Sequence, residues 1–184
     1  NRTANIKDLK EFGAFYGFKV TEIGAQEVGD VAVSSTKIRI ALGAGAIKIA
    51  NEFLGYNFMI NGTVIKGKGL GKTIQFPTAN LKIEEPYKLI PKKGVYLVES
   101  IIDTKLVYGM LNIGTNPTVS DANELSVEVF FFDFNQTLYG QVLTIQFLDR
   151  IRDEIKFSGL EGLKSQLEQD QQAAFAKITL LTKN

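Results

Sequence analysis

The run Ser126–Phe132 places a carboxylate in a stretch of chain that the pattern predicts to be enclosed. Side chains of a β-strand alternate between two faces, so Val127 and Val129 share one face while Glu128 and Phe130 share the other. Apolar residues on both faces are typical of a buried strand. A carboxylate there costs several kcal/mol unless it is paired or neutralised. Glu128 is therefore a candidate base; the competing interpretation is a structural ion pair with a nearby lysine, or an edge position.

A second group of polar residues lies in the segment Gln75–Leu81. Pro77 restricts the backbone, and in an extended segment the side chains of Thr78 and Asn80 face the same side. A hydroxyl and an amide oxygen side by side suit Mg²⁺ or a phosphate group. The alternative is an edge strand whose polar residues only form a turn.

The segment Gly67–Thr73 combines three glycines with basic residues. Glycines let backbone N–H groups approach an anion, and lysines add positive charge. The spacing excludes a P-loop, because Lys66 stands where that motif requires glycine, and Pro77 prevents a long helix from following. Two interpretations stay open here: a phosphate-binding loop and a flexible basic turn.

The composition restricts the chemistry further. The chain of 184 residues contains neither histidine nor cysteine, so acid–base work falls to Asp, Glu, Lys or Tyr, and disulfide and thiolate chemistry are excluded. A metal would be a hard cation bound by oxygens, which favours Mg²⁺ over Zn²⁺. A net charge of +1 lacks the positive excess typical of nucleic-acid or membrane binding. With no apolar run near the ~20 residues of a membrane span and no secretion signal, we expect a cytoplasmic location.

The first fifty residues read as α/β. Ile6 to Tyr16 has helical spacing, Phe18 to Ile23 reads as a short strand, and Ser34 precedes a helical pattern that resumes from Ile47 to Leu54.

After Gly55 the pattern becomes strand-like, and Pro and Gly separate the segments. The expected strands are 58–65, 94–102, 106–112, 125–132 and 142–147. Several strands without intervening helices predict an antiparallel barrel or sandwich. A long helix follows, with capping-box spacing of Ser158 and Glu161. Its expected apolar stripe consists of Leu160, Leu163, Leu167 and Ala174.

Several motifs then occur in the order found in riboflavin kinases. They are Gly62-x-Val64-x-x-Gly67, Phe76-Pro77-Thr78-Ala79-Asn80, Pro91-x-x-Gly94-Val95-Tyr96, Asn112-Ile113-Gly114-x-x-Pro117-Thr118, Val127-Glu128-Val129, Leu138-Tyr139-Gly140, and Ile151-Arg152 with Phe157. Together they resemble the riboflavin kinase module of bifunctional riboflavin kinase/FAD synthetases. The chain departs from that family at Lys72, where arginine is common, and at Gln75, where glycine is usual.

The resemblance implies a mainly β fold: an antiparallel, Greek-key-like barrel with a long C-terminal helix. It also implies ATP-dependent phosphorylation of riboflavin to FMN, with Mg²⁺ accompanying ATP and no tightly bound cofactor. Glu128 would be the catalytic base, and Thr78 and Asn80 would hold the metal. Arg152 and Phe157 would contact the flavin. The ATP-binding residues would be Gly67, Lys68, Gly71, Lys72, Thr73 and Thr78.

The segment Val33–Arg39 resembles the Ser-Ser-Thr-x-Ile-Arg motif of the adenylyltransferase half of the same bifunctional enzymes. We therefore expect residues 1–52 to be the C-terminal remnant of an FMN adenylyltransferase domain, a small α/β piece, and residues 53–184 to be the kinase domain. That half depends on a histidine-containing motif, so FAD synthesis should be absent from this chain.

Other classes of function stay open at this point. A small barrel with exposed aromatic residues could bind single-stranded nucleic acid, although the near-zero net charge argues against nucleic acid as a partner. The chain could also bind flavin without turning it over. We expect riboflavin and ATP as partners and no membrane; a monomer is compatible with the sequence, which leaves the oligomeric state open.

Overall fold

We analysed a computed structural model of the chain, which describes residues 5–22, 24, 27–29, 31–67, 69–115 and 125–183. The chain divides into two compact units, Asn1–Val33 and Ser34–Asn184. Each unit is described by itself.

The first unit contains one helix and a two-stranded ribbon: α1 (Ile6–Tyr16), β1 (Glu27–Val28) and β2 (Val31–Ala32). Asn5 caps α1 by accepting from the backbone N–H of Lys7, and Asp8 accepts in return from the backbone N–H of Asn5. The predicted helix is thus confirmed.

The strand expected at 18–23 is wrong for residues 18–22, and Ile23 lies outside the described residues. The backbone N–H of Phe18 donates to the carbonyl of Gly13 at the end of α1, where Gly17 has a φ of 76°. Phe18 therefore belongs to the C-terminal cap of α1, and the short strands β1 and β2 form later in the chain.

The second unit is built around a closed six-stranded barrel with strand order β3-β4-β7-β6-β5-β8. The strands are β3 (Met59–Ile65), β4 (Ala79–Lys82), β5 (Gly94–Ile102), β6 (Lys105–Thr115), β7 (Leu125–Phe131) and β8 (Val142–Arg152). All neighbouring strands are antiparallel. Strands β5, β6 and β7 form a meander and β8 returns beside β5, which is a Greek key. The predicted barrel is confirmed, and β5 has the expected bounds.

Two helices precede the barrel and pack onto it: α2 (Ser35–Ala44) and α3 (Ile47–Leu54). Leu42 and Ile47 are buried in the same cluster as the residues of the barrel interior. The boundary between the compact units thus falls before α2, whereas the expected domain boundary lay at 52/53. The assignment of residues 1–52 to an adenylyltransferase domain stays a prediction.

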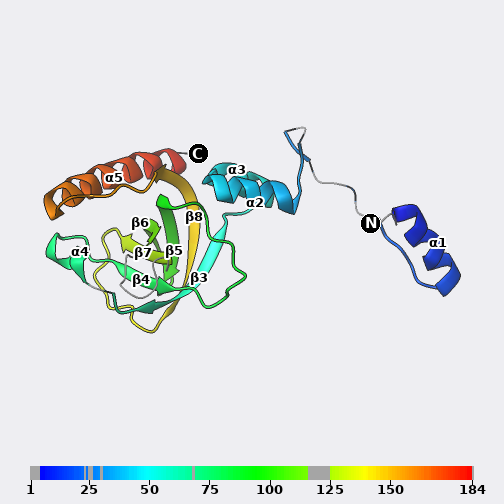
Figure 1. The fold of residues 1–184 in the computed structure, drawn as a ribbon, viewed down its shortest axis with the longest axis horizontal. Helices are drawn as coiled ribbons and strands as arrows, with labels where there is room; N and C mark the ends of the chain where they lie inside the picture. Colours follow the sequence, from blue (N-terminus) through cyan, green and yellow to red (C-terminus); the bar gives the residue numbers. More distant parts are fainter. Residues whose placement is uncertain are drawn as a thin grey trace. The chain divides into compact units, whose positions relative to one another are not determined.

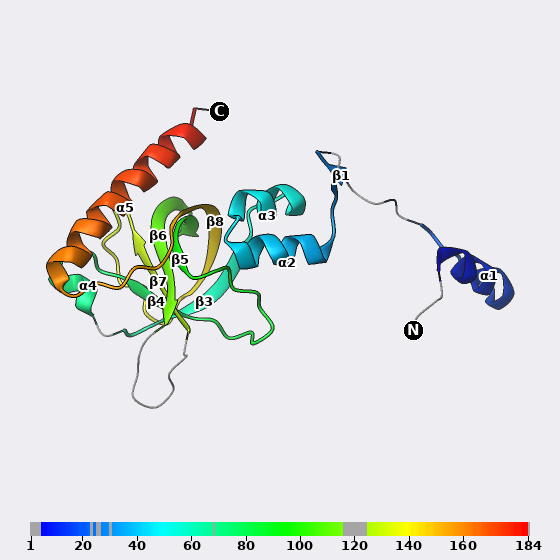
Figure 2. The ribbon, with the colours of Figure 1, turned by 45° about the horizontal axis from the view of Figure 1, so that its top comes forward.

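A long helix, α5 (Leu160–Leu181), lies across the outside of the barrel, and its first turns lie beside the short helix α4 (Leu70–Thr73) in both views (Figures 1 and 2). Apolar side chains under α5 form a second core, separate from the barrel interior. Because successive side chains of a strand point to opposite faces, the barrel strands contribute residues to both cores. In β7, for example, Val129 points into the barrel, whereas Phe130 packs in the outer cluster.

Two details of the expected C-terminal helix are wrong. Gly159, not Ser158, is the N-cap residue, and α5 has no side-chain capping bond, so the capping box with Glu161 does not form. Glycine tolerates the extended backbone of that cap but offers no side chain to the free N–H groups. Leu163 and Leu167 pack in the outer core as expected, whereas Leu160 is 48% exposed. No helix among the described residues is long and apolar enough to cross a membrane.

Candidate active site

A single row of residues crosses five strands of the barrel and carries most of the polar groups of the site. Asn80 on β4 pairs with Glu128 on β7, which pairs with Asn112 on β6. Asn112 then pairs with Val95 on β5, and Val95 with Arg152 on β8. Directly opposed residues on neighbouring strands project from the same face of a sheet. The barrel register therefore aligns these side chains on its outer face.

Glu128 is held by two hydroxyl groups. The Oγ1 of Thr78 donates to Glu128 Oε2 at 3.0 Å, and the Oγ of Ser126 donates to Oε1 at 3.1 Å. In the described part of the chain no lysine or arginine forms an ion pair with this carboxylate. Strand β7 is also flanked by β4 and β6, so it is not an edge. Among the described residues, Glu128 therefore has neither the structural ion pair nor the edge position that the sequence left open.

Glu128 opens into a cavity of about 260 Å³ between the barrel and the start of α5, which we call the Glu128 cavity. Its walls are largely apolar: the rings of Phe76 and Phe130 meet edge to face at 5.1 Å between centroids, and Leu163 comes from α5. Arg152 supplies a guanidinium group. An aromatic-walled cavity with a few convergent polar groups is typical of a site for a planar organic ligand.

A second cavity of about 180 Å³, which we call the Lys72 cavity, adjoins the first. It is lined by Lys72, by Pro77 and Thr78, and by the segment after β7 that runs from Asn135 to Tyr139. Thr78 lines both cavities and also binds Glu128. A molecule in the Lys72 cavity and one in the Glu128 cavity would therefore approach each other at Thr78, beside the carboxylate.

The glycine-rich segment forms one helical turn, α4, where a loop was expected. Gly69 precedes it with a φ of 73°, and a Cβ added at Gly71 would lie 2.1 Å from the carbonyl oxygen of Phe76. Glycine at 71 is thus required for the chain to fold back on itself. Gln75 closes the turn with a φ of 69°, a conformation that favours glycine. This angle gives a physical reason why glycine is usual at this position in the family that the motifs resemble.

Asn80 lies against the end of β3. A Cβ added at Gly67 would come within 2.1 Å of the Asn80 amide nitrogen, so glycine at 67 gives that side chain its space. Lys68, an expected ATP contact, lies outside the described residues. Thr73 ends α4 with an exposed side chain.

The site offers oxygen donors but no carboxylate cage. No group of three or more Asp, Glu, His or Cys residues in the described ranges could hold a metal ion. The hydroxyl of Thr78 and the amide of Asn80 remain as neutral oxygen ligands around Glu128. Mg²⁺ characteristically takes few protein ligands and completes its shell with substrate phosphates and water, so this donor set fits a metal that arrives with a nucleotide.

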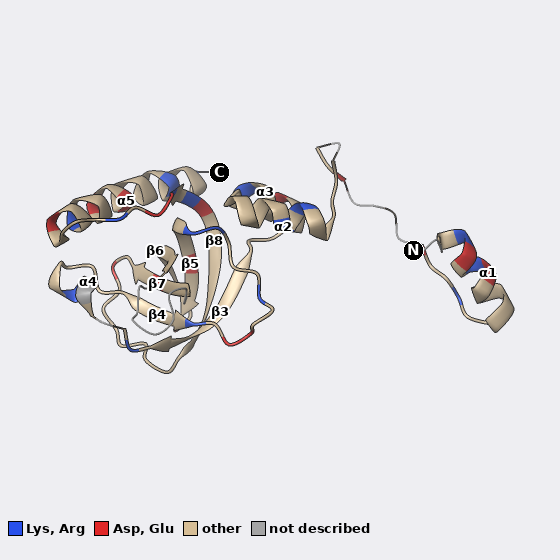
Figure 3. Cartoon of the chain, in the orientation of Figure 1, with Lys and Arg blue, Asp and Glu red and all other residues tan. Residues whose placement is uncertain are grey.

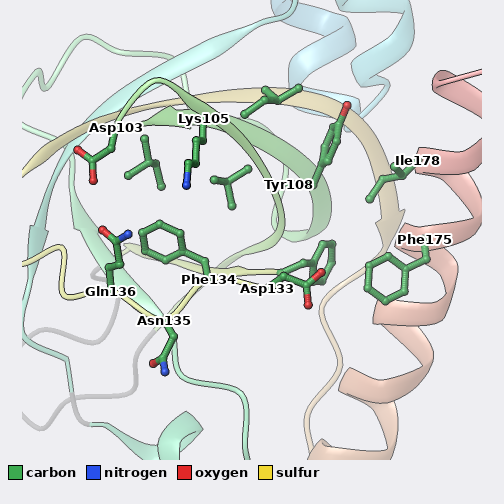
Figure 4. A pocket seen from close by; sticks show the side chains of 13 residues that line it. Asp103, Lys105, Tyr108, Asp133, Phe134, Asn135, Gln136, Phe175 and Ile178 are labelled. Atoms are coloured by element: carbon green, nitrogen blue, oxygen red, sulfur yellow. The ribbon is translucent and has the colours of Figure 1, made fainter.

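A further cavity, of about 500 Å³, lies elsewhere, between the β5–β6 turn, the segment after β7 and α5 (Figure 4). It is lined by Asp103 and Asp133, which both have positive φ, and by Phe175 and Ile178 of α5. Asp133 is thus a turn residue, and it does not line the Glu128 cavity.

Comparisons with known proteins identify the fold and the family. The family model for flavokinase, riboflavin kinase, matches residues 54–178. The chain belongs to the riboflavin kinase family. It is 44% identical over 164 residues to the bifunctional riboflavin kinase/FMN adenylyltransferase of Listeria monocytogenes, covering 88% of this chain and 52% of that protein. The Bacillus subtilis protein of the same name is 40% identical over 156 residues, with 84% and 49% covered. The chain thus spans about half the length of the curated relatives it matches.

A solved structure shares the architecture of this riboflavin kinase family member. It is named Macrolide-efflux Protein from Streptococcus pneumoniae and is 34% identical, with a TM-score of 0.82 over 93% of this chain and 55% of that one. The family resemblance inferred from the motifs is confirmed. The N-terminal remnant stays a prediction.

The structure brings most of the expected riboflavin kinase residues together. Glu128, Thr78, Arg152, Phe157 and Gly71 all line the Glu128 cavity. Of the expected ATP-binding residues, Lys72 and Thr78 line the Lys72 cavity. Gly67 and Asn80 lie together at the end of β3, and Thr73 lines neither cavity. The individual roles of these residues remain proposals.

Sequence reasoning missed four residues of this riboflavin kinase site. They are Ser126, which binds Glu128, Asn112 and Glu154, which line its cavity, and Asp170, which binds Arg152. Strand alternation places Ser126 on the face of Glu128, but the hydrogen bond between them was not predicted. Asn112 needed the register between β6 and β7, and Asp170 needed the packing of α5 on β8.

Proposed function

We propose that this chain is an ATP-dependent riboflavin kinase, in which the 5′-hydroxyl of riboflavin attacks the γ-phosphate of ATP to give FMN and ADP. The observation that carries the proposal is the hydrogen bond between Thr78 and Glu128 at the junction of the two cavities. Membership of the family supports both the reaction and its substrates.

The lining of each cavity supports one substrate in each. Riboflavin would occupy the Glu128 cavity, where Phe76, Phe130 and Phe157 offer apolar faces to the isoalloxazine ring and Arg152 offers N–H donors to its carbonyl groups. The nucleotide would occupy the Lys72 cavity, with the lysine near its phosphates. Of the other expected ATP-binding residues, Gly71 lines the Glu128 cavity, and Gly67 and Thr73 line neither cavity.

Glu128 would accept the proton of the ribityl 5′-hydroxyl. A carboxylate has about four lone-pair positions, so its contacts with Thr78 and Ser126 leave room for a substrate hydroxyl. Those two contacts also fix the orientation of the carboxylate. Phosphoryl transfer depends mainly on positioning and on neutralising charge, and base assistance contributes roughly 10²–10⁴-fold. A glutamate is a suitable base in a chain without histidine.

The family implies a divalent metal together with ATP, and we propose Mg²⁺. Thr78 and Asn80 would hold it through the hydroxyl and the amide oxygen. When bound with ATP, the metal would neutralise charge on the phosphates. This assignment rests on the oxygen atoms of Thr78 and Asn80 and on the lack of histidine and cysteine in the chain.

We further propose that residues 1–52 derive from an adenylyltransferase domain, as in the bifunctional relatives, and that the protein acts in the cytoplasm. Neither a nucleic acid nor a membrane is proposed as a partner. Lys, Arg, Asp and Glu are interspersed along α5 and the barrel (Figure 3), which does not favour a nucleic-acid groove.

The decisive experiment is turnover of riboflavin by the purified chain. With riboflavin and Mg-ATP, chromatography should show FMN and ADP forming in equal amounts. Glu128→Gln purified in parallel controls for contaminating host kinase. Riboflavin binding without FMN formation would instead establish a non-catalytic flavin-binding protein. Salt-sensitive binding of an oligonucleotide, without flavin binding, would favour the nucleic-acid alternative.

A further inference from the structure

Arg152 lines the Glu128 cavity from the end of β8, and its guanidinium group binds the carboxylate of Asp170 on α5. The Nε of Arg152 donates to Asp170 Oδ1 at 2.8 Å, and its Nη2 donates to Oδ2 at 2.7 Å. This is the side-on, two-point geometry in which a guanidinium fits a carboxylate. The pair fixes both the position and the plane of the Arg152 head group.

Asp170 is itself held rigidly. It is 2% exposed, which makes it one of the two buried polar residues of the described chain. Its Oδ1 also accepts from the Nε2 of Gln166, one turn earlier on α5, at 3.0 Å. Because a carboxylate loses its hydration on burial, such a group is retained only where partners replace the water. Here the partners are Arg152 and Gln166.

The guanidinium retains donors for a ligand. The bonds to Asp170 use the N–H of Nε, which is shared between both carboxylate oxygens, and one N–H of Nη2. Arg152 also donates from Nη1 to the carbonyl oxygen of Asp153 at 2.9 Å. An arginine has five N–H groups, so two N–H groups remain at the end of the fork. Arg152 lines the Glu128 cavity with a side chain that is 16% exposed. Its bonding therefore leaves a planar, pre-oriented donor edge at the cavity.

We infer that Asp170, supported by Gln166, is a positioning residue that holds Arg152 in the orientation required for flavin binding. This inference rests on the proposed riboflavin kinase function. Asp170 does not line the cavity and would act only through Arg152. Helix α5 contributes to the site in two ways: Leu163 forms part of the apolar wall, and Asp170 binds Arg152. The helix therefore does more than cover the barrel.

A second ion pair between α5 and β8 allows an experiment to distinguish the positioning of Arg152 from the general attachment of the helix. Lys177 binds Asp149 about two turns beyond Asp170, and neither residue lines the Glu128 cavity. Breaking this pair should loosen α5 without freeing Arg152. Lys177→Met is therefore the matched control for Asp170→Asn.

The test compares steady-state kinetics for the two substrates. For Asp170→Asn we expect the KM for riboflavin to rise about tenfold, equivalent to about 1.4 kcal/mol, with kcat and the KM for ATP within about twofold of wild type. Direct titration with riboflavin in the absence of ATP should show the same loss. Asp170→Glu should recover part of the affinity. Lys177→Met should lower the melting temperature while leaving the KM for riboflavin unchanged.

A double variant tests whether Asp170 acts through the arginine. In an Arg152→Ala background, Asp170→Asn should change riboflavin affinity by less than about twofold, because the group it orients is gone. If Asp170→Asn does not fold, Gln166→Met removes only the supporting hydrogen bond and should raise the KM for riboflavin by a smaller factor.

Equal losses for riboflavin and ATP in Asp170→Asn, or full additivity with Arg152→Ala, would overturn the positioning role and leave a purely structural ion pair. A riboflavin affinity in Asp170→Asn and Gln166→Met equal to that of wild type would do the same. If the wild-type chain forms no FMN at all, the proposed function fails, and that outcome is visible before any variant is measured.

Discussion

The Oγ1 of Thr78 donates to Oε2 of Glu128 at 3.0 Å, although the two residues lie 50 positions apart. The bond connects the segment before β4 with β7, and it lies where the Glu128 and Lys72 cavities meet. Thr78 binds the carboxylate of the proposed base, and we propose that its oxygen also contacts the metal and phosphates. Changes at Thr78 should therefore affect nucleotide binding as well as catalysis, whereas changes at Glu128 should affect catalysis alone.

We predict that Glu128→Gln binds riboflavin and Mg-ATP as wild type does but lowers kcat by roughly 10²–10⁴-fold, because the amide is not a base. Quenched-flow or steady-state FMN formation measures the loss. Glu99→Gln is the matched control, since Glu99 is also a half-buried strand glutamate but binds Asn57 away from both cavities. A wild-type kcat in folded Glu128→Gln would exclude the base assignment.

We predict that Asn80→Ala weakens Mg-ATP binding by about tenfold or more, roughly 1.4 kcal/mol, and leaves riboflavin binding nearly unchanged. Asn80 pairs with Glu128 across β4 and β7 and lines neither cavity, so the prediction rests on its proposed role as a metal ligand. Calorimetric titration of each ligand tests this. Asn61→Ala provides the control, because Asn61 bonds Thr144 on the β3–β8 side of the barrel. Equal losses for both ligands would indicate a distorted segment.

For Thr78, Thr78→Val should lower both Mg-ATP affinity and kcat, whereas Thr78→Ser should keep most of both. Valine has a similar shape but no hydroxyl to orient Glu128, and serine retains the hydroxyl. Measuring kcat and the ATP KM for the two variants separates the hydroxyl from the side-chain volume. A fully active Thr78→Val would remove the hydroxyl from the mechanism.

We predict that Gln75→Gly raises the free energy of unfolding by about 1 kcal/mol. Gln75 has a φ of 69°, and this left-handed conformation costs a residue with a Cβ roughly 1–2 kcal/mol. Glycine removes that cost, but the gain is partly cancelled because glycine loses more conformational freedom on folding. Denaturant unfolding at neutral pH gives the value. A loss of stability would show that the Gln75 side chain makes contacts that outweigh the strain.

A pH-dependent contribution to stability is expected from Asp149. Burial raises the pKa of this carboxyl, but hydrogen bonds from Lys177 and from the backbone N–H of Arg150 outweigh that effect, so the pKa lies below its usual value of 3.8. A lowered folded-state pKa means that the stabilisation is present above about pH 4 and is lost as the pH falls through the folded value.

Asp149→Asn should therefore lower the free energy of unfolding by about 1–3 kcal/mol at pH 7, and the difference from wild type should shrink below pH 4. Urea unfolding at several pH values measures this. Asp153→Asn is the comparison: Arg150 and Lys92 lower the pKa of Asp153 to about 2, but its carboxyl is exposed, so its loss should be smaller. A pH-independent difference for Asp149→Asn would show that the packing of the side chain, rather than its charge, is responsible.

The chain of 184 residues should form FMN but no FAD. In the family that residues 33–39 resemble, AMP transfer depends on a histidine-containing motif, and the chain contains no histidine. Ser34 caps α2 by accepting from the backbone N–H of Lys37, which is a structural role available without nucleotide. Chromatography of a reaction with riboflavin and ATP tests this. FAD in proportion to enzyme, in a preparation free of host synthetase, would contradict the prediction.

The sequence by itself determined most of the local elements and indicated Glu128 as the proposed base. Alternation of side chains is a property of a few consecutive residues, so the two faces of the Glu128 strand were readable, and the bounds of β5 follow from the same pattern. Helix α2 was signalled by its cap at Ser34. The strand expected at 18–22 failed because an isolated strand needs a partner, and no local pattern shows whether one exists.

Only the tertiary structure decided which of these elements meet. The strand order that sets Asn80, Glu128, Asn112 and Arg152 in one row depends on pairings between distant segments, and a shift of one residue would turn each side chain to the other face. Likewise, Asp170 in the sequence is one acidic residue on a mostly polar helix. Its contact with Arg152 depends on how α5 lies across β8, because the packing energy that places a helix comes from the whole outer core rather than from residues near it in the chain.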